Sequence, residues 1–348
     1  MNFLETINIE DENNNFDYKK YIDKKEDVNQ KTNDYLTGKI KRGYGIKLPI
    51  LDNIIVCKSN EMFACVGKKG RGKTTIQLMF FLMWAMVNDL KYVLCLQEND
   101  NALVNKDLLG YLLGENPKKV LKSNPELHEK ALSWLSEHFI FLKDIDDFKQ
   151  ATEVTRNIIN KGVKIQSLFI DPVNSIDSGW FSTGNNYIDE KKTAKKLLSF
   201  AHEVCGLFLS QHPTMSAQRS KEDVNSYDAE GGHYLNKADF TWVINRDNGT
   251  NENRISVDNV RNKYTGGGVT SPDSPLIVHW GKYNIHIEYD GEFEKDVIQK
   301  IRKRFNPLKE NFEDDFSEEK KELPKINPLE AFGENNKDNN EDEKDVPF

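Results

Sequence analysis

Short apolar runs recur between residues 61 and 212, and longer stretches with helical spacing of apolar and polar positions separate them. Runs such as EMFACVG, KYVLCLQ and GLFLSQH are apolar nearly throughout, which is typical of strands buried on both faces of a sheet. Parallel strands need a crossover, usually a helix, so this alternation predicts an α/β fold with a mostly parallel central sheet flanked by helices. The expected strands are 61–67, 91–97, 138–144, 165–171 and 206–212, and the expected helices include 74–88, 146–161 and 187–204.

The pattern changes towards the C-terminus. Segments 238–247, 253–264 and 275–280 follow one another closely and are polar at alternate positions. We therefore expect antiparallel strands added at one edge of the sheet. Residues 213–237 are polar and are predicted to form a loop, and residues 292–304 are predicted to form a short helix.

Both ends of the chain are polar. Residues 17–38 predict a helix whose sparse anchors Tyr21, Val28 and Tyr35 recur every seven residues. Residues 305–348 carry fourteen acids and six lysines, so this tail holds the whole net charge of −8 and leaves the rest of the chain neutral. The expected organisation is a disordered N-terminus with a linker helix (1–42), an α/β domain (43–304) and a disordered acidic tail (305–348).

The cysteines and the apolar runs bear on the compartment. None of the four cysteines forms a C-x-x-C pair, so we expect buried thiols in a reducing compartment and no zinc site. The N-terminus is acidic and rich in Asn, unlike a signal peptide. The longest apolar run, 76–87, is about twelve residues and too short to span a bilayer. These features predict a cytoplasmic protein with no membrane contact.

A glycine-rich loop between a predicted strand and a predicted helix carries the clearest chemical signal. Residues 67–74, GKKGRGKT, match the P-loop pattern G-x-x-x-x-G-K-[ST]. Its glycines let backbone N–H groups turn toward phosphates, and the helix N-terminus adds partial positive charge. Lys73 is expected to reach the β- and γ-phosphates of ATP, and the Thr74 hydroxyl to bind Mg²⁺. The candidate nucleotide-binding residues are Gly67, Lys68, Lys69, Gly70, Arg71, Gly72, Lys73, Thr74 and Thr75.

Other polar residues follow the strands that are expected to end beside this loop. Asp171 ends one buried strand and is the candidate for holding the Mg²⁺ shell and the nucleotide. Glu98 follows another and could polarise the attacking water, or be an ordinary loop carboxylate. Gln211 and His212 end a third strand and point to opposite faces, so only one of them is expected to sense the γ-phosphate.

Arg261 and Lys263 lie two residues apart on a predicted strand, so their side chains share one face. A cation donated across a subunit boundary can stabilise the charge that develops in phosphoryl transfer. A solvated strand face is the alternative interpretation.

These segments in this order resemble the RecA-like motor domains of superfamily 4 replicative helicases, including the DnaB type, the Twinkle type and phage primase-helicases. The resemblance covers roughly residues 43–290. It departs from the family pattern in two places: Leu48 replaces a glycine, and the finger pair has Arg261 before Lys263 rather than the reverse, which matters because lysine lacks the fork of arginine. The matching segments are LPILD (48–52), LCLQE (94–98), Asp171, LSQ (209–211) with HP (212–213), 238–247, and RNKYTG (261–266).

The resemblance implies a RecA-like P-loop fold that assembles as a ring, with six subunits expected, and binds ATP at subunit interfaces. It further implies that the arm 17–38 docks on a neighbouring subunit and that loops 173–190 and 213–237 hold single-stranded DNA in a central channel. Lys and Arg contacts to the DNA backbone would make that binding salt-dependent. The candidate contact residues are Asn174, Ser175, Lys191, Lys192, Arg219, Ser220 and Lys221. For the lysines within 191–196, a solvated helix face is the alternative interpretation.

The chain ends in an acidic run followed by Val346, Pro347 and Phe348. This end is similar to the tips of bacterial single-strand-binding proteins and predicts docking to a polymerase, a primase or another replisome protein. A tail that only keeps the protein soluble is the alternative.

The resulting functional hypothesis is an ATP-dependent replicative DNA helicase that translocates on single-stranded DNA, of a kind that a phage would encode. Two alternatives stay open: a RecA-like recombinase that forms an open filament, and a nucleotide-gated replisome adaptor that does not unwind DNA. The sequence decides neither the direction of translocation nor the preference among nucleotides.

Overall fold

The computed structural model describes most of the chain outside its two ends. The chain divides into two units, Met1–Leu308 and Lys309–Phe348. The second unit lies outside the described residues, and so does the segment that holds Arg261 and Lys263; the predicted acidic tail, its terminal Phe348 and the predicted finger pair are therefore not located. The described residues are 24–37, 39, 43–230, 232–247, 249–260, 269–270 and 273–308.

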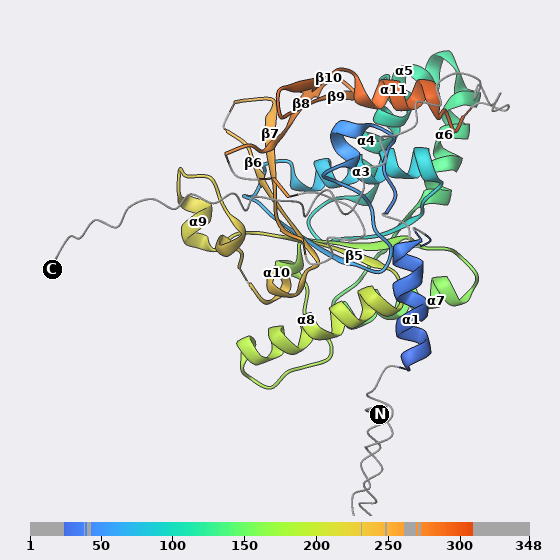
Figure 1. Ribbon diagram of the computed structural model, residues 1–348. Coiled ribbons are helices and arrows are strands. Elements are labelled where there is room, and N and C mark those ends of the chain that lie inside the picture. The colour runs from blue at the N-terminus through green and yellow to red at the C-terminus, as the bar shows by residue number, and fades with distance from the viewer. Residues whose placement is uncertain are drawn as a thin grey trace, which may run out of the picture. The chain divides into compact units, whose positions relative to one another are not determined.

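A ten-stranded sheet, with the order β10-β9-β8-β7-β6-β1-β5-β4-β2-β3, runs through the described part of the first unit (Figure 1). Strands β6 to β3 of that order are parallel, and β7 to β10 are antiparallel additions at one edge. This confirms the predicted α/β fold. The expectation that 238–247 forms an antiparallel edge strand is wrong, because residues 240–245 pair in parallel with β1, lie inside the sheet and are almost entirely buried, as in the other parallel strands. The parallel strands are β1 (Met62–Val66), β2 (Tyr92–Leu96), β3 (Phe139–Phe141), β4 (Ser167–Asp171), β5 (Gly206–Gln211) and β6 (Phe240–Asn245). The antiparallel strands are β7 (Glu252–Val260), β8 (Leu276–Gly281), β9 (Asn284–Tyr289) and β10 (Glu292–Glu294).

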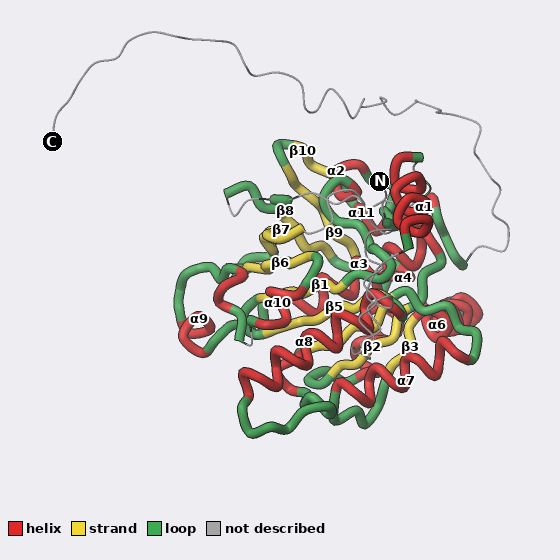
Figure 2. Tube along the Cα trace, turned by 60° about the horizontal axis from the view of Figure 1, so that its bottom comes forward, coloured by secondary structure: helices red, strands yellow, loops and turns green. Residues whose placement is uncertain are grey.

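Helices cover both faces of the sheet (Figures 1 and 2). Along β1 the side chains alternate: Phe63 and Cys65 join one buried apolar cluster, and Met62, Ala64 and Val66 join the other. The first cluster includes residues of α3 (Lys73–Asn88), α4 (Asn101–Leu113), α6 (Pro125–His138) and α11 (Val297–Arg304). The second includes residues of α7 (Phe148–Asn160), α8 (Asn186–Glu203) and α10 (His233–Lys237).

The helix that follows the glycine-rich loop is buried on nearly every side. Helix α3 reads KTTIQLMFFLMWAMVN, and twelve of its sixteen residues are buried, as expected of a helix that is apolar all round. Phe81 stacks on Tyr92 and meets Phe208 edge-on, with ring centroids 4.7 Å apart in both pairs. Each fully buried side chain of this size contributes about 1.5–3 kcal/mol to folding. This packing fixes the position of the N-terminus of α3.

The remaining helices are short or lie apart from the sheet. Helix α1 (Lys25–Leu36) leaves Val28 46% and Leu36 80% exposed. None of the described helices combines the length and apolar character needed to cross a membrane. The others are α2 (Pro49–Asp52), α5 (Pro117–Ser123), α9 (Met215–Arg219) and the 3₁₀ turns η3 (Val173–Ser175) and η4 (Ser226–Asp228).

Two of the predicted boundaries are wrong. The segment 213–237 is not a plain loop, because it contains α9, η4 and α10. Residues 292–294 form strand β10 rather than the start of a helix, and α11 begins only at Val297. The hairpin between β9 and β10 explains the second error: Asp290 and Gly291 both have positive φ, 50° and 79°, the backbone of a tight turn that Asp-Gly favours.

Candidate nucleotide-binding site

Four neighbouring strands deliver the candidate site residues to one edge of the sheet. Strands β1, β5, β4 and β2 are adjacent and parallel, so their C-terminal ends meet there. The glycine-rich loop follows β1, Glu98 follows β2, Asp171 ends β4, and His212 follows β5. In open α/β sheets this edge is where ligands bind. Residues separated by up to 145 positions in the sequence therefore converge because of the strand order.

The glycines of the loop have distinct roles in its shape. Gly70 and Gly72 have φ of 72° and 86°, which side-chain-bearing residues rarely adopt. A Cβ at Gly67 would lie 2.6 Å from the backbone oxygen of Ile244 on β6, so no larger residue fits there. A Cβ at Gly70 would meet nothing within 4 Å, so the loop is open at this point. The open, left-handed turn leads directly into α3, the arrangement that binds phosphates in other proteins.

The antiparallel edge of the sheet braces the loop. The Asn253 side chain on β7 donates a 2.6 Å hydrogen bond to the Arg71 carbonyl, and it accepts one of 2.6 Å from the Trp280 indole on β8. Asn253 is fully buried, so both hydrogen bonds are shielded from water. Sequence reasoning missed this pair, because the residues lie more than 180 positions from the loop.

Lys73 is buried, with only 5% of its surface exposed. Its ammonium lies 3.2 Å from Nδ1 of His212 and 3.4 Å from the carbonyl oxygen of Lys68. Burial lowers the pKa of Lys73, and the nearby Asp171 and Glu98 carboxylates oppose that effect. A buried cation so lightly compensated is suited to an anionic ligand, and the phosphates of a nucleotide supply that charge.

Thr74 and Asp171 lie together at the start of α3 and the end of β4. The Thr74 hydroxyl donates a hydrogen bond to Oδ2 of Asp171, and Asp171 is 3% exposed. Hydroxyl and carboxylate oxygens are the ligands that Mg²⁺ takes alongside nucleotide phosphates. No group of three or more His, Cys, Asp or Glu side chains in the described residues could hold a metal by itself. The pair thus fits an ion that is shared with a nucleotide rather than held by protein alone.

Glu98, His212 and Lys73 form a chain of contacts. His212 Nε2 lies 3.5 Å from Glu98 Oε1, and Nδ1 of the same ring faces the Lys73 ammonium. Burial lowers the pKa of His212, Lys73 lowers it further, and Glu98 opposes them. A neutral ring that accepts from Lys73 at Nδ1 and carries its proton on Nε2 fits this geometry. The Lys69 ammonium also lies 3.5 Å from Glu98 Oε1.

Gln211 and His212, predicted to point to opposite faces, differ in their contacts. His212 faces Lys73 and Glu98. Gln211 is fully buried, and neither polar atom of its side chain has a hydrogen-bond partner in the described structure. The structure therefore brings His212 to Lys73. The side-chain amide of its neighbour Gln211 keeps a donor and an acceptor without a partner among the described residues.

The loop after β5 is tied to the glycine-rich loop. The Lys68 ammonium donates hydrogen bonds of 2.6 and 2.7 Å to the carbonyl oxygens of Ser220 and Glu222. The backbone N–H of Lys69 donates to the Gln218 side chain at 3.2 Å. These contacts join residues about 150 positions apart, and no sequence signal indicated them.

Three other candidate residues lie near these contacts. Arg219 and Lys221 are exposed and, with Lys68, Arg71 and Ser220, line a cavity of about 490 Å³. Thr75 is exposed and lines a smaller cavity of about 90 Å³ with Thr74.

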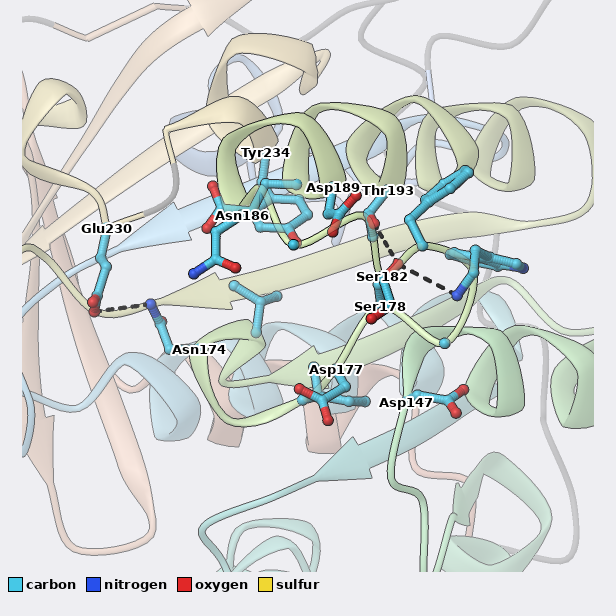
Figure 3. A pocket seen from close by; sticks show the side chains of 17 residues that line it. Asp147, Asn174, Asp177, Ser178, Ser182, Asn186, Asp189, Thr193, Glu230 and Tyr234 are labelled. Atoms are coloured by element: carbon cyan, nitrogen blue, oxygen red, sulfur yellow. Dashed lines mark hydrogen bonds between the residues drawn. The ribbon is translucent and has the colours of Figure 1, made fainter.

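The loop after β4 has a different character. It borders a cavity of about 800 Å³ whose described lining includes five carboxylates and neither Lys nor Arg (Figure 3). Asn174 lies at one end, where its Oδ1 accepts a 2.8 Å hydrogen bond from the His212 backbone and its Nδ2 donates to Glu230 at 3.2 Å. The acidic lining residues are Asp147, Asp177, Asp189, Glu190 and Glu230.

The other predicted contact residues of this region do not join that cavity. Ser175 is exposed at the end of η3, and Lys191 is exposed on α8. The Lys192 ammonium lies 5.5 Å from the centre of the Phe181 ring.

Comparison with known proteins agrees with this geometry at the level of the fold. No protein-family profile matches the sequence, and no curated protein matches it by sequence. Among solved structures, one described as an ATPase domain is similar, with a TM-score of 0.58 and 14% identity over 77% of this chain and 96% of that chain. Another, a DnaB-like replicative helicase described with its interactions with primase, has a TM-score of 0.58 and 13% identity over 75% of this chain and 66% of that chain. The chain therefore has the fold of the ATPase domain of DnaB-type replicative helicases.

Proposed function

We propose that this protein is an ATP-dependent DNA helicase motor that translocates on single-stranded DNA. The observation that carries the proposal is the convergence of Lys73, Thr74, Asp171, Glu98 and His212 at one edge of the sheet, beside an open phosphate-binding loop. The fold that the chain shares with the ATPase domain and with the DnaB-like helicase supports the choice of DNA as the substrate on which the motor acts.

The residues at the sheet edge divide the work of hydrolysis. Thr74 and Asp171 would hold Mg²⁺, which neutralises phosphate charge when it is bound with ATP. Lys73 neutralises charge on the phosphates, and its low exposure increases the strength of that interaction. Glu98, one-third exposed and in contact with His212 and Lys69, orients or deprotonates the attacking water. His212 links Glu98 to Lys73 and would report on the γ-phosphate between them.

Assembly into a ring is part of the proposal. Val28 and Leu36 leave apolar surface exposed on α1, which is suited to packing on a neighbouring subunit. Arg261 and Lys263 are proposed to complete the site of the next subunit in the ring. Both roles follow from the resemblance to replicative helicases.

The test is the steady-state rate of ATP hydrolysis by the full chain with and without single-stranded DNA, compared with Glu98→Gln. DNA is expected to stimulate hydrolysis, and Glu98→Gln is expected to reduce turnover about 10²–10⁴-fold, the usual contribution of a general base. Glu137→Gln removes an exposed carboxylate on α6 and serves as the matched control.

The possible results separate the two parts of the proposal. A rate of ATP hydrolysis that DNA does not change would contradict the motor function and favour the nucleotide-gated adaptor. DNA-stimulated turnover that survives Glu98→Gln would keep the motor function and remove Glu98 from its assigned role. Equal losses in Glu98→Gln and Glu137→Gln would show that the effect is not specific to the site.

A further inference from the structure

Tyr227 is the most exposed large hydrophobic side chain in the described part of the chain, with 96% of its surface accessible. It lies in the 3₁₀ turn η4, within the segment that joins β5 to β6. An aromatic ring normally buries much of its surface, so a tyrosine held almost entirely in water is unusual. Among the described residues, this ring is therefore available for contact with a ligand.

Hydrogen bonds fix the turn that carries Tyr227. The Asn225 side chain accepts from the backbone N–H of Tyr227 at 2.8 Å, and the Asp228 side chain accepts from the backbone N–H of Asn225 at 2.8 Å. These reciprocal hydrogen bonds form a capping box. All of them use the Tyr227 backbone or its neighbours, so the ring takes no part in holding the turn.

Both sides of the turn are anchored to the rest of the protein. The Asn245 side chain on β6 exchanges two hydrogen bonds, of 2.9 and 2.8 Å, with the backbone of Val224. On the other side, the Thr214 N–H donates to the Asp228 carbonyl at 2.7 Å, and Pro213 pairs with Ala229. A ring presented from an anchored turn loses little conformational freedom on binding, which favours a binding role.

The same segment carries two exposed cations that can contact a nucleic acid backbone, together with the acids Glu222, Asp223, Asp228 and Glu230. Arg219 and Lys221 are exposed a few residues before the turn. The neighbouring residues Ser220 and Glu222 accept hydrogen bonds, through their backbone carbonyls, from Lys68 of the glycine-rich loop. Proteins that hold single-stranded nucleic acid combine cations that follow the backbone with aromatic rings on which bases stack. The cavity beside the loop after β4 is lined by five carboxylates and by neither Lys nor Arg, which would repel phosphates. The cavity beside Arg219 and Lys221 holds three carboxylates, but its lining also includes five Lys or Arg side chains.

We propose that Tyr227 is a stacking platform for one nucleobase of the bound single-stranded DNA, whose backbone is contacted by Arg219 and Lys221 of the same segment. This inference rests on the proposed function and adds to it a contact to a base, which is independent of base identity because every base has a flat face. The motor would thus hold each strand partly through its bases, and that share of the affinity would be insensitive to salt.

The experiment compares two fluorescent oligonucleotides of equal length, one of thymidines and one of abasic sugar-phosphate units, in equilibrium binding to the full chain with a non-hydrolysable ATP analogue. The wild type should bind the thymidine strand about 5- to 150-fold more tightly, the range expected for stacking of one base. Tyr227→Ala should lose that preference and bind the abasic strand as the wild type does. Tyr227→Phe should retain the preference, because the flat ring remains.

Controls separate this inference from the proposed function. Phe293→Ala removes a half-exposed ring on β10, at the far end of the sheet, and should behave as the wild type. A wild type that binds both strands equally would overturn the stacking role and leave the motor intact. A wild type that binds neither strand would overturn both proposals.

Two further results would also overturn the stacking role. Tyr227→Ala could weaken binding to both strands by the same factor, or it could change the oligomeric state in sedimentation. Either result would assign the ring to a contact between subunits.

Discussion

The loops after β4 and β5 leave adjacent parallel strands at the same edge of the sheet, yet their side chains give them different properties. The loop after β4 borders an acidic cavity, and its Asn174 side chain accepts a hydrogen bond from the His212 backbone at the candidate nucleotide site. The loop after β5 begins at His212 itself, contacts Lys68 and Lys69, and presents Arg219, Lys221 and Tyr227 to solvent. Position in the fold alone would assign both loops to DNA. The contacts with Lys68 and Lys69 and the two exposed cations favour the second loop, although its segment also carries the acids Glu222, Asp223, Asp228 and Glu230.

The two loops also differ in whether they contact hydrogen-bond donors that a nucleotide phosphate would need. On the glycine-rich loop, the Lys68 ammonium donates to the carbonyl oxygens of Ser220 and Glu222, and the backbone N–H of Lys69 donates to the Gln218 side chain. The Lys69 ammonium faces Glu98 instead. An arriving phosphate competes for the same donors, so nucleotide binding and the position of this loop are coupled. The loop after β4 has no comparable contact with a phosphate-binding lysine in the described structure.

The largest expected effect comes from reversing the charge of the loop after β5. Arg219→Glu with Lys221→Glu should weaken binding of single-stranded DNA about tenfold or more at low salt, and should reduce the slope of log affinity against log salt concentration by about 1.4, since each phosphate contact contributes about 0.7. The matched variant, Asp177→Asn with Glu190→Gln, removes charge from the acidic cavity and should leave the slope unchanged. A salt titration of DNA affinity measures the slope for both double variants. An unchanged slope in Arg219→Glu with Lys221→Glu would contradict the proposed difference between the loops.

A smaller effect is expected from Lys68→Ala. The variant lacks the ammonium for which a phosphate and the Ser220 and Glu222 carbonyls compete. Nucleotide binding can then no longer move the loop after β5 through Lys68, so saturating nucleotide should alter DNA affinity less than it does in the wild type. Coupling between two sites typically amounts to about 5- to 150-fold, and the variant should lose about fivefold or more of it. DNA affinity measured with and without a non-hydrolysable ATP analogue gives the ratio.

The control for Lys68→Ala is Lys118→Ala, which removes an exposed lysine on α5, outside both loops. If Lys68→Ala retains the full ratio, the coupling runs through other contacts, and the hydrogen bonds of Lys68 only hold the loop in place.

The smallest expected effect concerns His212, where the two loops meet, with Lys73, Glu98 and Asp171 around its ring. Burial and Lys73 lower its pKa below the ordinary value near 6.5, so at about pH 7.5 the ring is neutral in both the folded and the unfolded chain. As the pH falls below about 6.5, the unfolded chain takes up the proton first, and the free energy of unfolding decreases until the folded ring is also protonated. The wild type should therefore lose more of its Tm between about pH 7.5 and 5 than His212→Asn does.

Calorimetry of the nucleotide-free protein measures that difference. For a domain of this size about 1 kcal/mol corresponds to about 2–4 °C, so a modest change is detectable. Parallel curves for the two proteins would show that the His212 ring does not titrate differently on folding, and would argue against its close contact with Lys73.

The parts of the structure that are local in sequence were predictable. The strands and helices of the parallel half were predicted to within a few residues because buried strands are apolar throughout and the helices between them are longer. The glycine-rich loop lies between β1 and α3 as expected, since its pattern and its backbone shape are encoded in the same eight residues. The strand order then places Asp171 beside Thr74, which the position of Asp171 at a strand end already indicated.

The parts that depend on distant residues were not predictable. Lys68 was expected to bind only nucleotide, and its contact with Ser220 and Glu222 arises from how the segment after β5 folds back over the edge of the sheet. Asn253 and Trp280 carry no motif, and their role comes from the register of β7 and β8. In the sequence Tyr227 is only one member of a polar segment, because the exposure of a single ring depends on the turn that presents it.

The brace formed by Asn253 and Trp280 has a consequence for biosynthesis. A ribosome makes the glycine-rich loop early, but the carbonyl of Arg71 acquires its partner only after residue 253 has been made, and that partner is itself held by residue 280. The backbone oxygen of Ile244, against which Gly67 packs, also comes late. We infer that the glycine-rich loop of a nascent chain acquires its full set of supporting contacts only after nearly all of the first unit has emerged.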